Sequence, residues 1–261
     1  MRIDLTGRRA LVTGSTSGMG FAIAQGLAEA GAAVVVNGRH VDRVRDAVDR
    51  LRSAVPGAGV DGVTADVGVA DELERLAAEV PDVDVLVSNA GPTEVAGFFD
   101  IPDEDWERFV DVYVMAGVRL SRRYVPGMID RGWGRVMFNG SVTSGYQPGE
   151  MAHWGTAKAA VLGLARGIAE NVAGSGVTVN TFIPGPTHTK ESFEARHPGD
   201  GPTFEEVERQ FFEGPLGTSL IGRFVHPREV AHLVVFLASE QASAITGSTV
   251  RVDGGIIRSL L

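Results

Sequence analysis

Short apolar runs alternate with longer amphipathic segments along the chain. Val-rich, nearly continuous runs are typical of strands buried on both faces, and the longer segments are typical of helices packed against them. The pattern predicts strands at residues 9–12, 33–36, 60–64, 83–88, 134–139, 177–182 and 249–252. It predicts helices at residues 19–30, 41–54, 71–79, 103–131, 155–173 and 227–238. This alternation indicates an α/β fold, a Rossmann-type doubly wound parallel sheet of about seven strands flanked by helices.

All 261 residues fit a single domain, because no linker in the sequence justifies a second one. Residues 190–224, before the last predicted helix and strand, do not follow the alternation. This interval is too long for an ordinary connection, so we predict that it forms a lid or substrate loop.

Composition and charge narrow the possible functions. The formal net charge is −9 and the basic residues do not cluster, so neither nucleic acid nor a membrane is an expected partner. The absence of cysteine excludes disulfides and thiolate metal sites. No His-x-x-x-His or clustered carboxylate pattern predicts a metal site, and no Gly-x-Ser-x-Gly pattern predicts a nucleophilic serine. The first nine residues lack the apolar region of a signal peptide, so a cytoplasmic location is expected.

A glycine-rich turn joins the first predicted strand to the first predicted helix, with the spacing Gly14-x3-Gly18-x-Gly20. Glycines let the backbone approach a pyrophosphate, which then lies at the positive end of the helix. The predicted cofactor contacts in this turn are Gly14, Ser15, Thr16, Ser17, Gly18, Met19 and Gly20.

This spacing resembles that of the short-chain dehydrogenase/reductase family, and further segments match the family in order along essentially the whole chain. The resemblance implies that Asp66 and Val67 lie at the adenine, and that Asn89, Ala90 and Gly91 follow the fourth strand at the cofactor. It implies that a Pro-Gly loop reaches the nicotinamide amide through Pro184, Gly185, Thr187 and Thr189. Residues 252–255, Val-Asp-Gly-Gly, match the end of the family's last strand.

The end of the second strand predicts which nicotinamide cofactor binds. An acidic residue there would bind the ribose diol and repel a 2′-phosphate, but this chain has Asn37-Gly38-Arg39. The guanidinium of Arg39 presents a donor fork that suits phosphate. We therefore expect NADP(H) rather than NAD(H), and tighter binding of NADH would overturn this expectation.

The resemblance also locates the family's serine, tyrosine, lysine and helix asparagine. Ser141 matches the serine that orients the substrate oxygen, and Lys158 matches the lysine that holds the nicotinamide ribose. Trp154 stands in the position of the proton-donating tyrosine, and Tyr113 in that of the asparagine that fixes a water behind the lysine. An indole N–H is too weak an acid to replace a phenol near neutral pH, so ordinary ketone reduction should lose about 10²–10⁴-fold in rate.

Three interpretations of this altered tetrad compete. In the first, Tyr113 or Tyr146 supplies the acid for a carbonyl reductase. In the second, the substrate is an iminium ion, or a hemiaminal that forms one, and accepts hydride without a proton donor while Trp154 offers its π face to the cation. In the third, hydride transfer is lost and the fold carries a non-redox cyclase, dehydratase or isomerase, or a cofactor-binding pseudoenzyme.

We favour the second interpretation, an NADPH-dependent reductase of a small C=N substrate with a biosynthetic role, as in secondary metabolism, or a protective one. The predicted substrate contacts are Ser141, Tyr146, His153, Trp154 and His188. The predicted lid agrees with a cationic substrate because phenylalanines alternate there with Glu191, Glu194, Glu205, Glu206, Glu208 and Glu213.

The resemblance further implies a homo-oligomer, either a tetramer or a dimer. The helices predicted at residues 103–131 and 155–173 would supply one interface. The apolar tail at residues 256–261 would supply another, because it would be unfavourable in water.

Overall fold

The computed structural model describes residues 2–188, 193, 201–214 and 217–259. One sheet of seven parallel strands runs through the centre, in the order β3-β2-β1-β4-β5-β6-β7. The strands are β1 (Arg9–Val12), β2 (Ala33–Gly38), β3 (Val60–Thr64), β4 (Val85–Ser88), β5 (Gly134–Asn139), β6 (Val177–Pro184) and β7 (Thr249–Val252). The predicted doubly wound α/β fold is confirmed.

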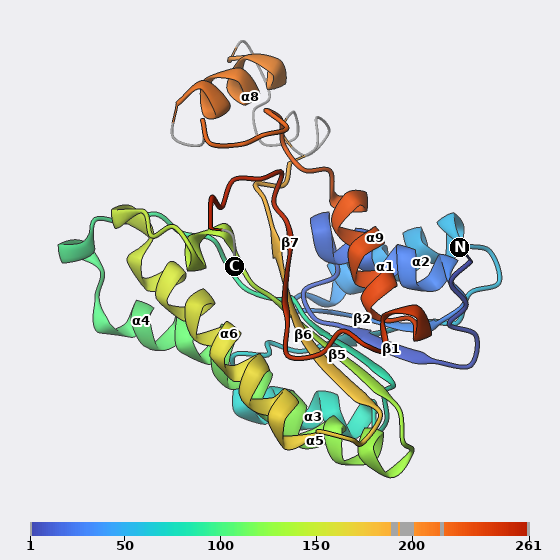
Figure 1. Cartoon of the computed structure of the whole chain (residues 1–261). Helices are drawn as coiled ribbons and strands as arrows, with labels where there is room; N and C mark the ends of the chain where they lie inside the picture. Colours follow the sequence, from blue (N-terminus) through green and yellow to red (C-terminus); the bar gives the residue numbers. More distant parts are fainter. Residues whose placement is uncertain (1, 189–192, 194–200, 215–216, 260–261) are drawn as a thin grey trace.

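Helices cover both faces of the sheet (Figure 1). One apolar layer packs β1 and β2 against α1 (Gly18–Glu29), α2 (Val41–Ala54) and α9 (Pro227–Leu237). The other packs the sheet against α3 (Ala70–Glu79), α5 (Ala116–Asp130) and α6 (Ala152–Asn171). Because both faces are covered, the central strands are largely apolar, which explains their Val-rich runs. No helix among the described residues is both long and apolar enough to cross a bilayer.

The helix predicted at residues 103–131 has an interruption. It consists of α4 (Asp103–Val110), a π-helical turn (Asp111–Met115) and α5. A π turn inserts one residue into the helical register, and such turns are frequent at functional sites. This turn contains Tyr113 and changes the direction in which its side chain leaves the helix.

The predicted lid contains a short helix, α8 (Phe204–Glu213), that the sequence analysis did not identify. Thr203 and Glu206 form a reciprocal capping box at its start, with 3.2 Å between the Glu206 amide nitrogen and Thr203 Oγ1. Phe212 packs with Phe224, Ile183, Val142 and Ile256 in a third apolar cluster. The described part of the lid is therefore attached to the end of the sheet through phenylalanine side chains.

The strand order reverses its direction at β1, which lies between β2 and β4. In open parallel sheets, the loops that follow the strands on either side of such a point diverge and leave a crevice at the carboxyl ends. The turn after β1 and residues 89–92 after β4 border this crevice. The candidate site is therefore at this edge of the sheet.

Candidate functional site

The glycine turn packs closely against its neighbours. Gly14 has φ +62°, and a Cβ there would lie 2.7 Å from the Cα of Ala90. A Cβ on Gly20 would lie 2.2 Å from the carbonyl oxygen of Gly14. Both positions exclude a side chain, so the backbone of the turn lies against α1 and the β4 loop, as a phosphate cradle requires.

A cavity of about 270 Å³ opens beside this turn. It collects residues from the ends of β1, β2, β3 and β4 that the sequence analysis had assigned to the cofactor. They are Gly14, Thr16, Ser17, Asn37, Arg39, Asp66, Val67, Asn89, Ala90 and Gly91. Three of the other predicted turn residues have different surroundings: Gly18 borders open space, Met19 packs against the core, and Ser15 is fully buried.

Ser15 and Asn37 form a structural pair beneath the cavity. The Ser15 hydroxyl donates to the carbonyl oxygen of Val12 (2.7 Å) and accepts from the Asn37 amide (3.0 Å). The Asn37 side chain donates to the carbonyl oxygens of Val63 and Ala65 and accepts from the Gly14 amide. The Ser15 hydroxyl thus links the end of β1 to β2, and the Asn37 side chain stabilises the glycine turn.

The rim of the cavity beside β2 is basic. Arg39 lies 3.8 Å from the carboxylate of Asp66, and both side chains remain accessible to solvent. His40 and Arg43 line the same rim, and the sequence analysis missed both. A signal for Arg43 was its place in the first turn of α2, directly after the loop that carries Arg39.

A chain of hydrogen bonds connects the glycine turn to Lys158. The Asn89 side chain donates to the carbonyl oxygen of Thr13 (3.0 Å), and the Asn89 amide donates to the Thr13 hydroxyl (2.9 Å). The Asn139 side chain donates to Asn89 Oδ1 (3.0 Å), and Lys158 Nζ donates to the Asn139 carbonyl oxygen (2.6 Å). The ends of β1, β4 and β5 are fixed relative to α6 by these bonds.

Lys158 is fully enclosed, and its ammonium group has few partners. It is 3% exposed, and desolvation lowers its pKa to about 7. No carboxylate among the described residues forms an ion pair with it; the Asn139 carbonyl oxygen is its hydrogen-bond acceptor. Its Nζ lies 4.2 Å from the centroid of the Tyr113 ring.

Tyr113 lies beside Lys158, but its phenol is directed elsewhere. The hydroxyl donates a hydrogen bond to the carbonyl oxygen of Pro92. Burial raises the pKa of Tyr113 well above its usual value, and the nearby indole N–H of Trp154 opposes this rise. The phenol is a weaker acid than a free tyrosine, which argues against Tyr113 as the substitute proton donor.

Trp154 packs against the same apolar layer as Tyr113. Its Nε1 is buried and has no hydrogen-bond acceptor among the described residues, but its N–H lies near the Tyr113 phenol and opposes the rise in the pKa of that group. The structure therefore brings Trp154, Tyr113 and Lys158 together.

The Ser141 hydroxyl is oriented by Thr143, a residue that the sequence analysis missed. Ser141 Oγ accepts hydrogen bonds from the Thr143 amide (3.2 Å) and from the Thr143 hydroxyl (2.8 Å). With both lone pairs occupied, the Ser141 proton is free to point outward as a donor.

The remaining predicted substrate contacts have mixed surroundings. His153 is 2% exposed, and its ring centroid lies 4.3 Å from that of Phe109 and 6.1 Å from that of Trp106. Consecutive helical residues point about 100° apart, so His153 faces α4, and its predicted contact with substrate stays a prediction. His188 stacks edge-on against Phe224 (4.8 Å between centroids), and Tyr146 is exposed on the loop after β5.

The Pro-Gly loop follows β6, which ends at Pro184. A Cβ on Gly185 would lie 3.0 Å from the carbonyl oxygen of Asp253, so this loop packs closely on the segment after β7. The Thr187 hydroxyl donates to the Gly185 carbonyl oxygen (2.8 Å). Thr189 lies outside the described residues.

Two of the lid carboxylates that the structure describes, Glu206 and Glu208, have structural partners. Glu206 caps α8, and Glu208 accepts a hydrogen bond from the Phe224 amide (2.8 Å). Glu191 and Glu194 lie outside the described residues. The arrangement of α8 therefore does not add support for a cation-binding lid.

Comparison with known proteins identifies the family. A family model described as enoyl-(acyl carrier protein) reductase matches residues 14–257. An uncharacterized oxidoreductase of Bacillus subtilis strain 168, YvaG, is 43% identical over 263 residues, with both chains fully covered. The chain belongs to the short-chain dehydrogenase/reductase family. Its curated relatives are oxidoreductases and dehydrogenases.

Two solved structures of short-chain oxidoreductases have closely similar folds. L-sorbose reductase from Gluconobacter frateurii, complexed with NADPH and L-sorbose, is 31% identical with a TM-score of 0.90 and full coverage of both chains. An NADPH-bound short-chain oxidoreductase from Pseudomonas aeruginosa PAO1, described as containing an atypical catalytic centre, is 30% identical with a TM-score of 0.89. The match covers 98% of this chain and 99% of that one.

The role of Thr143 can be tested by substitution. Thr143→Val removes the side-chain donor and should lower kcat by about fivefold, because one hydrogen bond contributes about 1 kcal/mol. Thr143→Ser keeps the hydroxyl and serves as the matched control. Steady-state kinetics would contradict this role if both variants lost activity equally or if neither did.

Proposed function

We propose that this protein is an NADP(H)-dependent reductase of a small organic substrate whose C=N bond is already activated as an iminium ion or forms one from a hemiaminal. The observation that supports this proposal most strongly concerns the three tyrosines of the chain. The Tyr113 hydroxyl donates a hydrogen bond to the Pro92 carbonyl oxygen, and the Tyr124 hydroxyl donates one to the Val80 carbonyl oxygen. Tyr146 is 52% exposed on a loop. The residue four positions before Lys158 is Trp154. No described tyrosine is thus held beside Lys158 with its hydroxyl free.

The residues present fit a nicotinamide dinucleotide. The closely packed turn at Gly14 and Gly20, at the N-terminus of α1, would hold the pyrophosphate. Lys158 and Thr187 lie at the nicotinamide end in this assignment. When bound, the reduced cofactor supplies hydride, and this chain's residues orient the acceptor and exclude water around it.

The basic rim at Arg39, His40 and Arg43 favours NADP(H) over NAD(H). Guanidinium groups bind phosphate through charge-assisted hydrogen bonds. Asp66, the carboxylate nearest to Arg39, is already paired with it, at 3.8 Å. The NADPH complexes of two structural relatives are consistent with this choice.

Substitution of Arg39 tests the cofactor preference. Arg39→Ala should weaken NADPH binding about 10- to 100-fold, because hydrogen bonds to charged groups contribute about 1.5–3 kcal/mol. Binding of NADH, which has no 2′-phosphate, should change little. Fluorescence titration of both cofactors measures this, and equal losses for the two, or tighter parental binding of NADH, would contradict the assignment.

An iminium acceptor explains why a tyrosine acid is dispensable. Such an ion is already positive, so hydride addition yields a neutral amine without proton donation in that step. The Ser141 hydroxyl, oriented by Thr143, can position a hemiaminal oxygen. Trp154 would present an aromatic face to the cation. A ketone would instead develop negative charge on oxygen and require an acid.

Trp154→Tyr is the sharpest test of this substrate class. Supplying a phenol should increase reduction of simple ketones by about 100-fold, since a positioned acid commonly contributes 10²–10⁴-fold. Trp154→Phe adds no acid and is the matched control. Assays with a preformed cyclic iminium and with ketones, including ketose sugars, should show parental preference for the iminium. Parental turnover of ketones alone would favour a carbonyl reductase, and turnover without nicotinamide would favour a non-redox enzyme.

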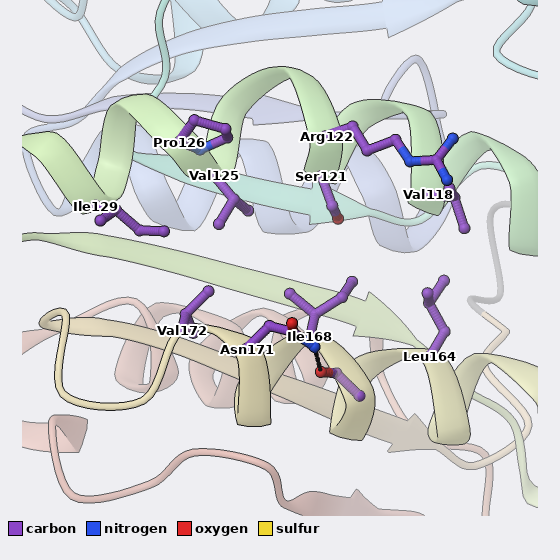
Figure 2. Close-up of a pocket in the computed structure, with 11 residues that line it drawn as sticks. Val118, Ser121, Arg122, Val125, Pro126, Ile129, Leu164, Ile168, Asn171 and Val172 are labelled. Carbon is purple, nitrogen blue, oxygen red and sulfur yellow. Dashed lines mark hydrogen bonds between the residues drawn. The ribbon is translucent and has the colours of Figure 1, made fainter.

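We also propose that the protein forms a homo-oligomer through α5 and α6. A groove of about 510 Å³ lies between these helices and is lined mainly by apolar side chains (Figure 2). Val125 and Ile129 of α5 face Ile168 of α6 and Val172, which follows α6, in this view. An apolar groove on two neighbouring helices suits a second copy of the same surface.

Ile129→Lys tests this interface. Ile129 is 40% exposed in the groove, so a charge there should oppose association without disturbing the core. Val69→Lys, at a similarly exposed valine outside the groove, is the control. Sedimentation analysis should show dissociation of the Ile129 variant only. A monomeric parent protein, or an Ile129 variant with parental mass, would contradict the proposal.

A further inference from the structure

The ammonium group of Lys158 has unusual surroundings for a buried cation. Buried charges normally require a counter-ion or several hydrogen-bond acceptors. Here Nζ donates to the Asn139 carbonyl oxygen and otherwise faces the ring of Tyr113, 4.2 Å from the centroid. Glu94 and Arg108 exert electrostatic effects on Tyr113, but they form an ion pair with each other at 2.6 Å. Among the described residues, no charged side chain offsets the desolvation of Lys158.

We propose that Tyr113 is a positioning residue that holds the Lys158 ammonium by a cation–π interaction, in place of a carboxylate partner. An ammonium within about 6 Å of an aromatic centroid is attracted to the ring face, and this attraction strengthens when both groups are desolvated. The proposal rests on the proposed function only in assigning Lys158 to the cofactor. The contact between Lys158 and Tyr113 involves residues of this protein alone and needs no bound cofactor.

The ring is held in this position from three sides. Its hydroxyl donates to the Pro92 carbonyl oxygen, which fixes the far end of the ring. Gly91, at φ +152°, leaves room for it, since a Cβ there would lie 2.1 Å from Tyr113 Cε1. Phe109 packs against it with 5.8 Å between the centroids. The π turn at Asp111–Met115 sets the direction of the side chain, so the contact is built into the backbone.

This arrangement gives the phenol a role other than proton donation. A ring face stabilises a positive charge without accepting a hydrogen bond, so the remaining N–H donors of Lys158 are not consumed. They stay available for the ribose hydroxyls of a bound cofactor. Tyr113 would therefore preserve the orientation of Lys158 while its own hydroxyl serves only to anchor the ring.

Selective labelling of lysine can test this directly, because the chain has only two lysines, Lys158 and Lys190. In protein labelled with 13C-lysine, the Cε signals titrate with the ammonium groups, and Lys190→Arg assigns the Lys158 signal. The measured quantity is the pKa of Lys158 in the cofactor-free protein. The variants are Tyr113→Phe, which keeps the ring; Tyr113→Leu, which removes it; and Tyr113→Asn, which admits water.

The three variants should have different effects on the pKa of Lys158. Tyr113→Phe should retain the parental pKa of Lys158. Tyr113→Leu should lower it by about one unit, because loss of about 1–2 kcal/mol of cation–π attraction disfavours the charged form. Tyr113→Asn should raise it, since water relieves the desolvation that lowers it in the parent protein.

Two further measurements keep the test decisive. If Tyr113→Leu fails to fold, phenylalanines with increasing numbers of ring fluorines at position 113 keep the shape and weaken the π face, and the Lys158 pKa should fall stepwise. An unchanged pKa across the Leu or fluorinated variants would overturn the inference. NADPH titration of the parent protein separates the two proposals: absence of binding would refute the proposed function, whereas the lysine titration would still decide the role of Tyr113.

Discussion

The hydrogen-bond chain from Thr13 through Asn89 and Asn139 to Lys158 is the constraint on which the site depends. It joins the ends of three neighbouring strands to one helix, and every link lies between 2.6 and 3.0 Å. Because the links are buried or partly buried, breaking one would leave a polar group unsatisfied, which costs about 1–3 kcal/mol. The distance between the phosphate cradle and the buried lysine is therefore fixed by the sheet.

Within that frame, Tyr113 and Trp154 change what the site can do. Both pack against one apolar layer beside Lys158, and neither presents an acidic hydroxyl to the crevice. In the proposed function, the cofactor frame and the Ser141 donor are retained, and no described tyrosine donates a proton to the substrate. A site that binds the cofactor but donates no proton can reduce only acceptors that need no proton during hydride transfer. This restriction is the basis of our functional proposal.

Much of the fold was predictable because its physical causes are local in the sequence. Buried parallel strands require continuous apolar runs, so strands such as Gly134–Asn139 were found with their correct bounds. The helix α8 was missed although its capping box, Thr203 to Glu206, is a readable signal. The π turn was not predictable, because it depends on one inserted residue in the backbone register rather than on hydrophobic periodicity.

The site was predictable only in part, because the sequence shows which residues end the strands but not every contact between their side chains. Residues tied to strand ends, such as Asn37 and Asn89, were correctly grouped because parallel strands end at one edge. The packing of His153 against Phe109 of α4 was not predicted, because the sequence does not show which side of α6 the imidazole faces. Thr143 was missed because its contribution is a pair of hydrogen bonds to Ser141 that spacing alone does not reveal.

The central claim is that this site delivers hydride to an acceptor that needs no phenol acid. Its most direct test is turnover of a preformed cyclic iminium with NADPH deuterated at the transferable position of the nicotinamide, followed by mass spectrometry of the amine. We predict one deuterium at the former iminium carbon, from one face of the cofactor, with ketones reduced at least about 100-fold more slowly. Turnover without deuterium transfer, or equally efficient reduction of ketones, would contradict the account.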